Sequence, residues 1–367
     1  MKTFNPGLVR VALMLKFLWR FLGLFLSSRS YSPKLPPKTI LVFDFHLIGD
    51  IVLLTPLLQV LRGAYPDARI VLVAGPWAQE LLCGEEFVDE IIPFSAPWVK
   101  YRQGWRGWLI TWRLLRRLRR ESWDMGIEIR GDVRQILLLA WAGAKCRVGF
   151  NFTGGSALLT DVILDDGHFV HVTVHHQRIA EYLGIWPVNK EYLPFLRLTD
   201  EEIKQAKDIP AYVGIHLGAS LLLRKFFTEE AVNLIKEVAE STGFPIILFS
   251  GPGDIEYTKK LINAFDVSLT KRLQIWEGPL RAFMVMASRA DRFFCMDSGP
   301  AHIVAALGIP VTVFFGPNRP EYVMPLGKNI QIVENKEIAC RPCDQVNCTN
   351  NVEKACLSGL AKKWRIV

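Results

Sequence analysis

Cysteine is scarce in this sequence, and no segment is repetitive or of low complexity. Seven cysteines, an odd number, occur among 367 residues, so the chain lacks the dense disulfide framework of a small secreted protein. We therefore expect a reducing compartment. An even spread of glycine and proline excludes collagen-like and solenoid chains, and 50% hydrophobic with 22% charged residues excludes disorder. The length predicts two globular domains.

Acidic residues are in deficit. The 44 lysines and arginines outnumber the 36 aspartates and glutamates, which gives a formal net charge of +8. Such a charge favours an anionic partner, namely a nucleic acid, an acidic membrane or a phosphorylated substrate. The sequence contains no recognised nucleic-acid motif, so we expect no nucleic acid. It also contains no obvious Asp-x-Asp metal site.

The first long apolar run, residues 8–26, is interrupted by cations. At 100° per residue, Arg10, Lys16 and Arg20 fall within one sector of about a third of a helix circumference. This pattern favours an amphipathic helix that lies in the plane of a membrane, with a spanning helix and a cleaved signal peptide as the alternatives. The proline-containing run 32–37 predicts the end of the helix and a stiff linker. Residues 1–37 are thus expected to form a membrane-associated segment.

Beyond the linker, short apolar runs typical of buried strands alternate with stretches of helical spacing. In the first half we expect strands at 39–43, 69–74, 90–93 and 124–129 and helices at 51–61, 78–82 and 135–142. After a polar stretch, 199–210, we expect strands at 212–216, 246–249, 292–296 and 311–315 and helices at 229–240, 280–287 and 301–307. The alternation predicts an α/β protein with a parallel sheet in each half. We divide it into residues 38–205, 206–339 and a Cys-rich segment 340–367.

Each half contains one turn that joins a predicted strand to a predicted helix and carries candidate functional residues. Gly49 permits a tight turn and Asp50 follows at the helix start, where it either caps the helix or faces a ligand. In the second half Ser298 is expected to cap a helix, and Gly299 to let a ligand approach the backbone. The free N–H groups of such a helix start suit a diphosphate. An ordinary strand-to-helix connection is the alternative for this second turn.

Further polar residues lie on neighbouring loops. His46 follows the first strand beside Asp44, which is more often a structural arrangement than a catalytic one. Lys225 follows the Gly-containing loop 216–220 and could neutralise phosphates, or it could be a solvated surface cation. Glu256 lies in a further turn and could accept hydrogen bonds from ribose hydroxyls. His302 is interpreted either as a ligand-proximal residue or as a packed helix residue.

These motifs together resemble those of the family 9 glycosyltransferases, which include the ADP-heptose:lipopolysaccharide heptosyltransferases. The resemblance spans residues 39–360 and is carried by GDIVLLTPL (49–57), HLGAS (216–220) with Lys225, the turn 250–256 and MDSGPAHIVAALGIPVTVFFGP (296–317). It implies a GT-B fold, two doubly wound Rossmann-like domains facing a central cleft. The nucleotide sugar would bind mainly to the C-terminal domain and the acceptor to the N-terminal one. After Lys225 the sequence reads Phe226-Phe227-Thr228, which departs from the more typical Lys-x-Trp-Pro.

The resemblance also implies roles for single residues. Asp50 corresponds to the catalytic base. The donor would be bound by Ser220, Lys225, Glu256, Asp297, Ser298, Gly299 and His302. On the acceptor side we expect His46, Gly49, Arg102 and Arg106.

The implied reaction is an inverting sugar transfer from an ADP-sugar, in which heptose is the expected sugar and an anionic lipopolysaccharide core precursor the acceptor. No cofactor or metal is required if cations and a helix terminus stabilise the leaving diphosphate. The setting would be the cytoplasmic face of the bacterial inner membrane, with a peripheral or monotopic protein. A helix N-terminus should lower the pKa of Asp50 and so its basicity; either desolvation offsets this, or Asp50 mainly orients the acceptor. A sugar-nucleotide epimerase or hydrolase and a non-catalytic binding protein are the alternatives.

Three clusters remain. Cys340, Cys343, Cys348 and Cys356 are interpreted as packed or free thiols, with a structural metal and a redox-labile or disulfide cluster as alternatives. Four histidines show ligand-like spacing, but no cysteine or carboxylate completes the set: His168, His171, His175 and His176. Tryptophans alternate with arginines over residues 98–120, which favours an anionic membrane surface or a phosphorylated glycolipid, with a solvated amphipathic helix as the alternative.

Overall fold

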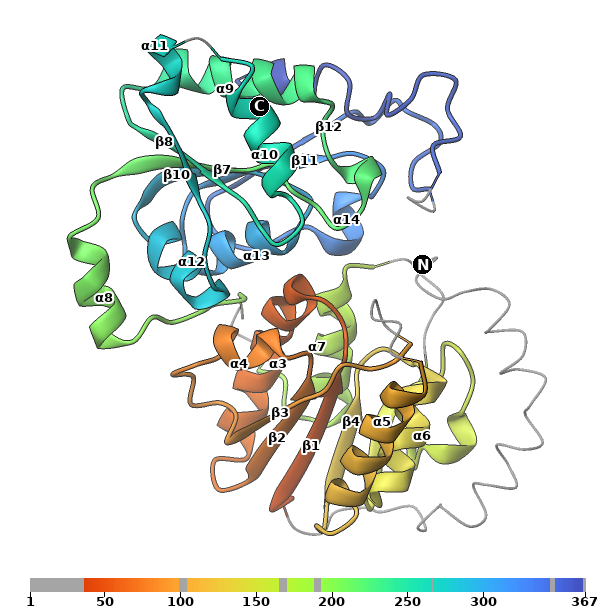
Figure 1. Cartoon of the computed structure of the whole chain (residues 1–367). Coiled ribbons are helices and arrows are strands. Elements are labelled where there is room, and N and C mark those ends of the chain that lie inside the picture. The colour runs from red at the N-terminus through yellow and green to blue at the C-terminus, as the bar shows by residue number, and fades with distance from the viewer. Residues whose placement is uncertain are drawn as a thin grey trace. The chain divides into compact units, whose positions relative to one another are not determined.

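The computed structural model describes residues 36–98, 104–164, 170–187, 193–265, 267–343 and 347–365. The chain forms two compact units, Met1–Tyr192 and Leu193–Val367, each built around its own sheet (Figure 1). The expected N-terminal helix, residues 8–26, lies outside the described residues, as do Arg102 and His168. No helix among the residues described is both long and apolar enough to cross a membrane.

The first unit contains a six-stranded parallel sheet. Its strands are β1 (Thr39–Asp44), β2 (Arg69–Ala74), β3 (Glu90–Pro93), β4 (Met125–Glu128), β5 (Cys146–Phe150) and β6 (Asp161–Ile163), in the order β3-β2-β1-β4-β5-β6. Its helices are α3 (Ile48–Ala64), α4 (Trp77–Leu81), α5 (Gly104–Leu118), α6 (Val133–Ala142) and α7 (Val172–Tyr182), with a short 3₁₀ turn, η1 (Ser156–Leu158). Because β1 pairs with both β2 and β4, the direction of winding reverses between β1 and β4. The loops after these two strands therefore flank the topological switch point, where ligands bind in open α/β sheets.

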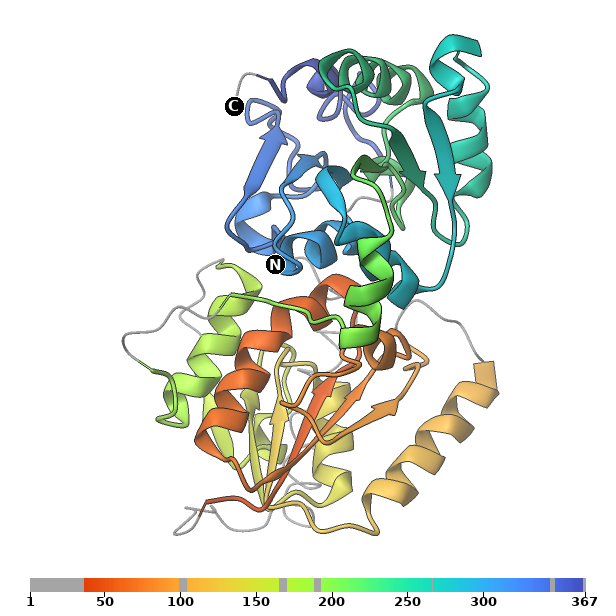
Figure 2. The same ribbon diagram turned by 90° about the vertical axis from the view of Figure 1, so that its left-hand side faces the viewer.

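Apolar side chains fix this layering. Every residue of β1 after Thr39 is buried, as expected for a central parallel strand covered on both faces. On one face Leu41 and Phe43 belong to a core cluster with Leu114 of α5 and Leu139 of α6. Helices α3 and α7 pack against each other on the opposite face, which Figures 1 and 2 both show.

The second unit repeats the plan. Its strands are β7 (Tyr212–His216), β8 (Ile246–Phe249), β9 (Leu273–Trp276), β10 (Ala290–Met296), β11 (Val311–Phe315) and β12 (Ile330–Glu334), in the order β12-β11-β10-β7-β8-β9. The helices are α8 (Asp200–Lys207), α9 (Thr228–Ser241), α10 (Ile255–Ile262), α11 (Val267–Thr270), α12 (Leu280–Ala287), α13 (Gly299–Ala306) and α14 (Pro320–Val323), with 3₁₀ turns η2 (Leu222–Arg224) and η3 (Leu360–Lys362). All pairings are parallel, and the winding reverses between β7 and β10.

The prediction of two doubly wound parallel α/β halves is confirmed. The sequence patterns did not indicate β5, β6, β9 and β12, and they left residues 199–210 as a polar stretch. That stretch contains α8, which begins with a reciprocal capping pair: Thr199 Oγ1 accepts from the Glu202 N–H at 3.3 Å, and Glu202 Oε2 accepts from the Thr199 N–H at 2.8 Å. Such a capping box stabilises a short polar helix that has little apolar surface to bury.

Candidate functional site

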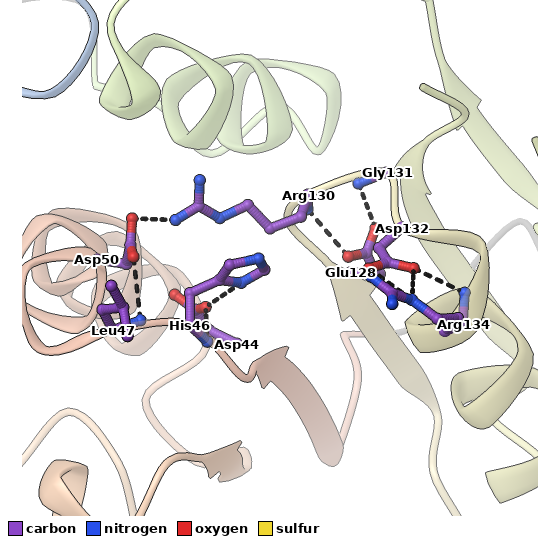
Figure 3. A network of polar contacts seen from close by, with 9 residues as sticks. All are labelled: Asp44, His46, Leu47, Asp50, Glu128, Arg130, Gly131, Asp132 and Arg134. Atoms are coloured by element: carbon purple, nitrogen blue, oxygen red, sulfur yellow. Dashed lines mark hydrogen bonds and ion pairs between the residues drawn. The ribbon is translucent and has the colours of Figure 1, made fainter. Parts of the chain in front are cut away.

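Five polar side chains converge at the switch point of the first unit (Figure 3). Asp44 is the last residue of β1 and Glu128 the last residue of β4, and these strands are neighbours. The loop after β1 carries His46 and leads to Asp50 in the first turn of α3, whereas the loop after β4 carries Arg130. We call this set, Asp44, His46, Asp50, Glu128 and Arg130, the Asp50 cluster. It brings together two of the residues expected from sequence, His46 and Asp50.

Asp50 is the third residue of α3 and is held from two sides. Its Oδ2 accepts a hydrogen bond from the Leu47 N–H at 3.1 Å, which satisfies one free donor at the start of the helix. Its Oδ1 forms an ion pair with Nη2 of Arg130. The Asp50 side chain retains 21% of its exposure, whereas that of Arg130 retains 7%. Asp50 therefore both caps α3 and presents a partly accessible carboxylate at the switch point.

The electrostatics of the cluster keep Asp50 ionised. Burial by itself would raise the pKa of Asp50, but the Arg130 guanidinium, followed by His46 and the Leu47 N–H, lowers the pKa below the usual 3.8. Burial likewise opposes the charge on Arg130, yet Asp50 and Asp44 outweigh it and raise the pKa of the guanidinium. The lowered pKa expected for a carboxylate at a helix start is confirmed. Arg130 adds a cause that the sequence did not indicate.

Asp44 orients His46. The Asp44 carboxylate is fully buried, and its Oδ1 accepts from the His46 N–H at 3.0 Å and lies 3.1 Å from Nδ1 of the imidazole. The contact fixes the ring with Nδ1 toward the carboxylate, which is the usual way to set a histidine tautomer. Within the described part of the chain, Oδ2 of Asp44 and Nε of Arg130 are buried without a hydrogen-bond partner.

Glu128 shapes the loop that delivers Arg130. Its carboxyl oxygens accept from the N–H groups of Arg130 at 3.0 Å and Gly131 at 2.6 Å. Burial, and then the nearby Asp132 carboxylate, raise the pKa of Glu128 well above 4.5, while the backbone N–H groups that it accepts from lower it. Gly131 adopts φ +64°, and a Cβ there would lie 2.9 Å from the backbone nitrogen of Phe152. The tight turn therefore requires glycine.

In the second unit, the residues predicted to bind the nucleotide sugar lie on both sides of the switch point between β7 and β10. Lys225 forms an ion pair with Asp254, and its Nζ lies 5.7 Å from the centre of the Tyr257 ring. Asp297, at the end of β10, is buried; its Oδ2 lies 3.4 Å from Nη1 of Arg224 and accepts from Nδ2 of Asn318 at 3.3 Å. Asp254 and Arg224 were not singled out as the ionic partners of these residues, and only the folded structure brings them close.

One expectation about the second turn is wrong. Ser298 stands at the N-cap position of α13, but its side chain does not cap the helix. Its Oγ donates instead to the carbonyl of Met296 at 3.1 Å. With extended dihedral angles at Ser298, the hydroxyl bonds back toward the strand. The first N–H groups of α13 are consequently not capped by this side chain.

The remaining predicted residues lie as follows. Gly49 is in the first turn of α3, and Ser220 is exposed. Glu256 keeps 79% of its side-chain exposure and lies 3.6 Å from Lys259. His302 is buried in α13. Arg106 is exposed on α5, with its guanidinium carbon 5.7 Å from the centre of the Trp105 ring.

The cysteine and histidine clusters form no metal centre in the described regions, where no group of three or more His, Cys, Asp or Glu residues could hold an ion. The four C-terminal cysteines do line one small pocket together with Arg341 and Lys354. Burial raises the pKa of Cys356 to about 11, which makes it an unreactive thiol at neutral pH. His175 packs edge-on against the rings of Phe150 and Phe152.

His176 lies close to the Asp50 cluster. It belongs to α7, is buried, and its Nδ1 lies 3.1 Å from the carbonyl of Leu53. Burial, and then the charge of Arg130, lower the pKa of His176 to about 4. The imidazole is therefore neutral near pH 7 and adds no charge to the cluster.

Comparisons with known proteins agree with this architecture. The family model of glycosyltransferase family 9 (heptosyltransferase) matches residues 111–353. Lipopolysaccharide heptosyltransferase 2 of Escherichia coli (strain K12) is 24% identical over 318 residues, which cover 80% of this chain and 87% of that protein. Two solved structures have similar folds. The E. coli ADP-heptose lps heptosyltransferase II has a TM-score of 0.69 at 21% identity, covering 83% of this chain and 95% of that one. The E. coli heptosyltransferase WaaC with ADP has a TM-score of 0.68 at 19% identity, covering 89% and 98%.

Proposed function

We infer the function from the premise that the chain belongs to glycosyltransferase family 9, the heptosyltransferase family. The protein is a glycosyltransferase. We propose that it transfers heptose from ADP-heptose to a lipopolysaccharide core precursor, an anionic glycolipid, at the cytoplasmic face of the bacterial inner membrane. The first unit would bind the acceptor and the second the nucleotide sugar.

The observation that carries the proposal is the Asp50 cluster. An inverting transfer needs a base that removes the proton of the acceptor hydroxyl while the nucleoside diphosphate leaves from the opposite face. Asp50 is ionised, partly accessible and fixed in position by Arg130 and the Leu47 N–H. These are the properties of a positioned general base.

The proposed transfer takes place in a single step. The acceptor oxygen forms a bond to the anomeric carbon, its proton passes to Asp50, and the bond from that carbon to the diphosphate oxygen breaks. ADP leaves with the bonding electrons and the configuration inverts. A carboxylate of low pKa suffices because the hydroxyl proton becomes acidic only as the new bond forms, late in the step. Arg130 then ensures that Asp50 is unprotonated whenever acceptor binds.

Donor binding is assigned to the second unit. The diphosphate would lie against the start of α13, after Asp297 and Ser298, where the Ser298 side chain does not cap the helix and Gly299 carries no side chain to block it. Lys225 would contribute positive charge, so that its present partner Asp254 would compete with the diphosphate. Exposed Glu256 is available to ribose hydroxyls, and Ser220 and His302 complete the proposed donor site. No metal or other cofactor enters these steps.

On the acceptor side the proposed contacts are His46, Gly49, Arg102 and Arg106. His46 is oriented by Asp44 beside the base, which suits a hydrogen bond to an acceptor oxygen. The two arginines would meet the negative charge of the glycolipid.

The test is a transfer assay. Purified protein is incubated with ADP-, UDP- and GDP-sugars, with and without a core-oligosaccharide acceptor. We expect transfer from the ADP-sugar only. Donor conversion without acceptor would indicate an epimerase or hydrolase, and binding without turnover a non-catalytic protein. Asp50→Asn should abolish turnover and keep ADP affinity, whereas the exposed Asp67→Asn serves as the matched control. Near-normal turnover of Asp50→Asn would exclude the base assignment.

A further inference from the structure

We propose that one face of α5 docks onto an anionic lipid bilayer. The inference rests on the proposed function for its setting, a lipid-linked acceptor, but its evidence is independent of the transfer chemistry. The α5 face consists of three apolar side chains on one stripe and three arginines, the last of them in the turn that ends the helix: Trp105, Leu109, Trp112, Arg113, Arg116 and Arg120.

The apolar part of the face is unusually exposed. Trp105 retains 73% of its accessible surface, Trp112 54% and Leu109 38%. Their spacing of four and three residues places them on one stripe of the helix. The opposite side is the packed one, where Leu114 and Leu118 join the core beneath the sheet. In Figure 2, α5 (light orange) lies on the outside of the first unit with its free side turned away from the sheet. Contiguous exposed aromatic surface of this kind marks an interaction site.

The charged part of the face is entirely positive. The helix sequence GWRGWLITWRLLRRL contains no acidic residue. Arg113, Arg116 and Arg120 are exposed, and the guanidinium carbon of Arg116 lies 5.2 Å from the centre of the Trp112 ring. Arg117 differs, since it forms an ion pair with Glu90 at the flank of the helix. The face thus combines indole rings with three guanidinium groups that form no ion pair within the described part of the chain.

This combination fits a bilayer surface better than the other anionic partners. Indole rings partition to the boundary between headgroups and acyl chains, and Leu109 between them would enter the same apolar layer. The arginines would remain at the level of the phosphates, attracted by the negative charge of the leaflet. A nucleic acid would offer phosphates to the arginines but no apolar layer for Leu109. An extended acidic peptide is also a poorer fit, because the convex face of a helix offers no groove to hold it.

The test uses the full chain and sedimentation with vesicles. Wild type should bind phosphatidylglycerol-containing vesicles more tightly than pure phosphatidylcholine, and salt should weaken this preference. The apolar variant should lower partitioning at least tenfold: W105Q/L109Q/W112Q. The charge variant should do so as well, because each cation near an acidic leaflet contributes about fivefold, or about 1 kcal/mol, before screening: R113Q/R116Q/R120Q.

Two matched controls separate the α5 face from general effects. One removes three exposed apolar side chains elsewhere: W141Q/L164Q/V352Q. The other removes three exposed cations of the second unit, so that net charge falls equally: K204Q/K207Q/K260Q. Both should bind like wild type. Brominated lipids should quench the tryptophan emission of wild type, which would show that indole rings contact the acyl chains, and should quench that of the apolar variant much less.

Several results would overturn the proposal. They are wild-type partitioning of either α5 variant, an equal loss in the controls, or competition by single-stranded RNA as strong as by lipid. A shift of the apolar variant from dimer to monomer without any vesicle binding would assign the face to a second copy of the chain. Transfer to a soluble, delipidated acceptor is measured in parallel. If wild type fails there while vesicle binding behaves as described, the proposed function is wrong and the docking surface stands.

Discussion

Replacing Arg130 by methionine tests how the Asp50 cluster works. The substitution keeps most of the side-chain volume and removes the guanidinium that pairs with Asp50. It leaves Asp50 and the fully buried Asp44 without that counter-charge. Burial, which raises the pKa of Asp50, then loses its largest opposing influence. We therefore expect the pKa of Asp50 to rise in Arg130→Met.

The energetic cost can be placed within bounds. Removing one partner of a buried ion pair costs about 3–5 kcal/mol. We expect about 3 kcal/mol, since Asp50 keeps 21% of its side-chain exposure and can still be hydrated. The double variant R130M/D50N should recover part of the loss, with a coupling energy of about 1–3 kcal/mol.

The pH dependence has a defined sign. Because the folded-state pKa of Asp50 is lowered from 3.8, the pair stabilises the protein above that pH and loses its effect as the pH falls below it. The stability gap between wild type and R130M should therefore be largest near neutral pH and shrink below about pH 4.

Urea unfolding across pH and the pH profile of kcat/KM are the two assays. If Asp50 is the base, the acidic limb of the profile moves to higher pH in R130M, because the base must be unprotonated to act. Arg134→Met is the matched control, because Arg134 pairs with Asp132, whereas the partner of Asp50 is Arg130. An unmoved limb in R130M, or an equal movement in R134M, would refute the reasoning.

Three further predictions concern single residues. The pKa of buried His176, lowered from 6.5 to about 4, means that stability should fall by about 3 kcal/mol as the pH drops from 6.5 to 4; His176→Gln should flatten the urea-unfolding profile in that window. Gly218→Ala would place a Cβ 2.7 Å from Cγ of Asp254. It should therefore disturb the ion pair of Asp254 with Lys225 and weaken the ADP binding that calorimetry measures. Gly243→Ala, whose Cβ would meet nothing within 4 Å, should leave ADP binding unchanged. Thr199→Ala removes the cap of α8 and should cost about 1 kcal/mol in thermal unfolding.

The central strands of each sheet could be predicted because a continuous apolar run is visible in the local sequence. A run such as TILVF in β1 is buried on both faces and stands out without any knowledge of the fold. β5 was missed because it carries Arg147, whose guanidinium is buried and donates to the carbonyls of Leu158 and Ala144 at 2.6 Å each. In sequence, an arginine that donates to buried carbonyls cannot be told from a solvated one.

The same distinction between local and long-range contacts applies to the candidate site. Gly49 and Asp50 could be found from sequence because the turn and the helix start are contiguous. Arg130 is 80 residues away from Asp50, and only the pairing of β1 with β4 brings it within reach. A polar residue directly after a predicted strand was the available signal, since the carboxyl ends of parallel strands share one edge of the sheet.

The cap that Asp50 provides for α3 does not exclude its proposed role as the base. A carboxylate offers about four lone-pair directions. The Leu47 N–H occupies one at Oδ2 and Arg130 one at Oδ1, so each oxygen keeps a further direction for an acceptor hydroxyl. The cap and the ion pair fix the carboxylate in place without using it up, and a fixed base loses no rotamer freedom when acceptor binds. The contacts that lower the pKa of Asp50 are therefore the same ones that position it, so a place at a helix start is compatible with the proposed role of Asp50 as the base.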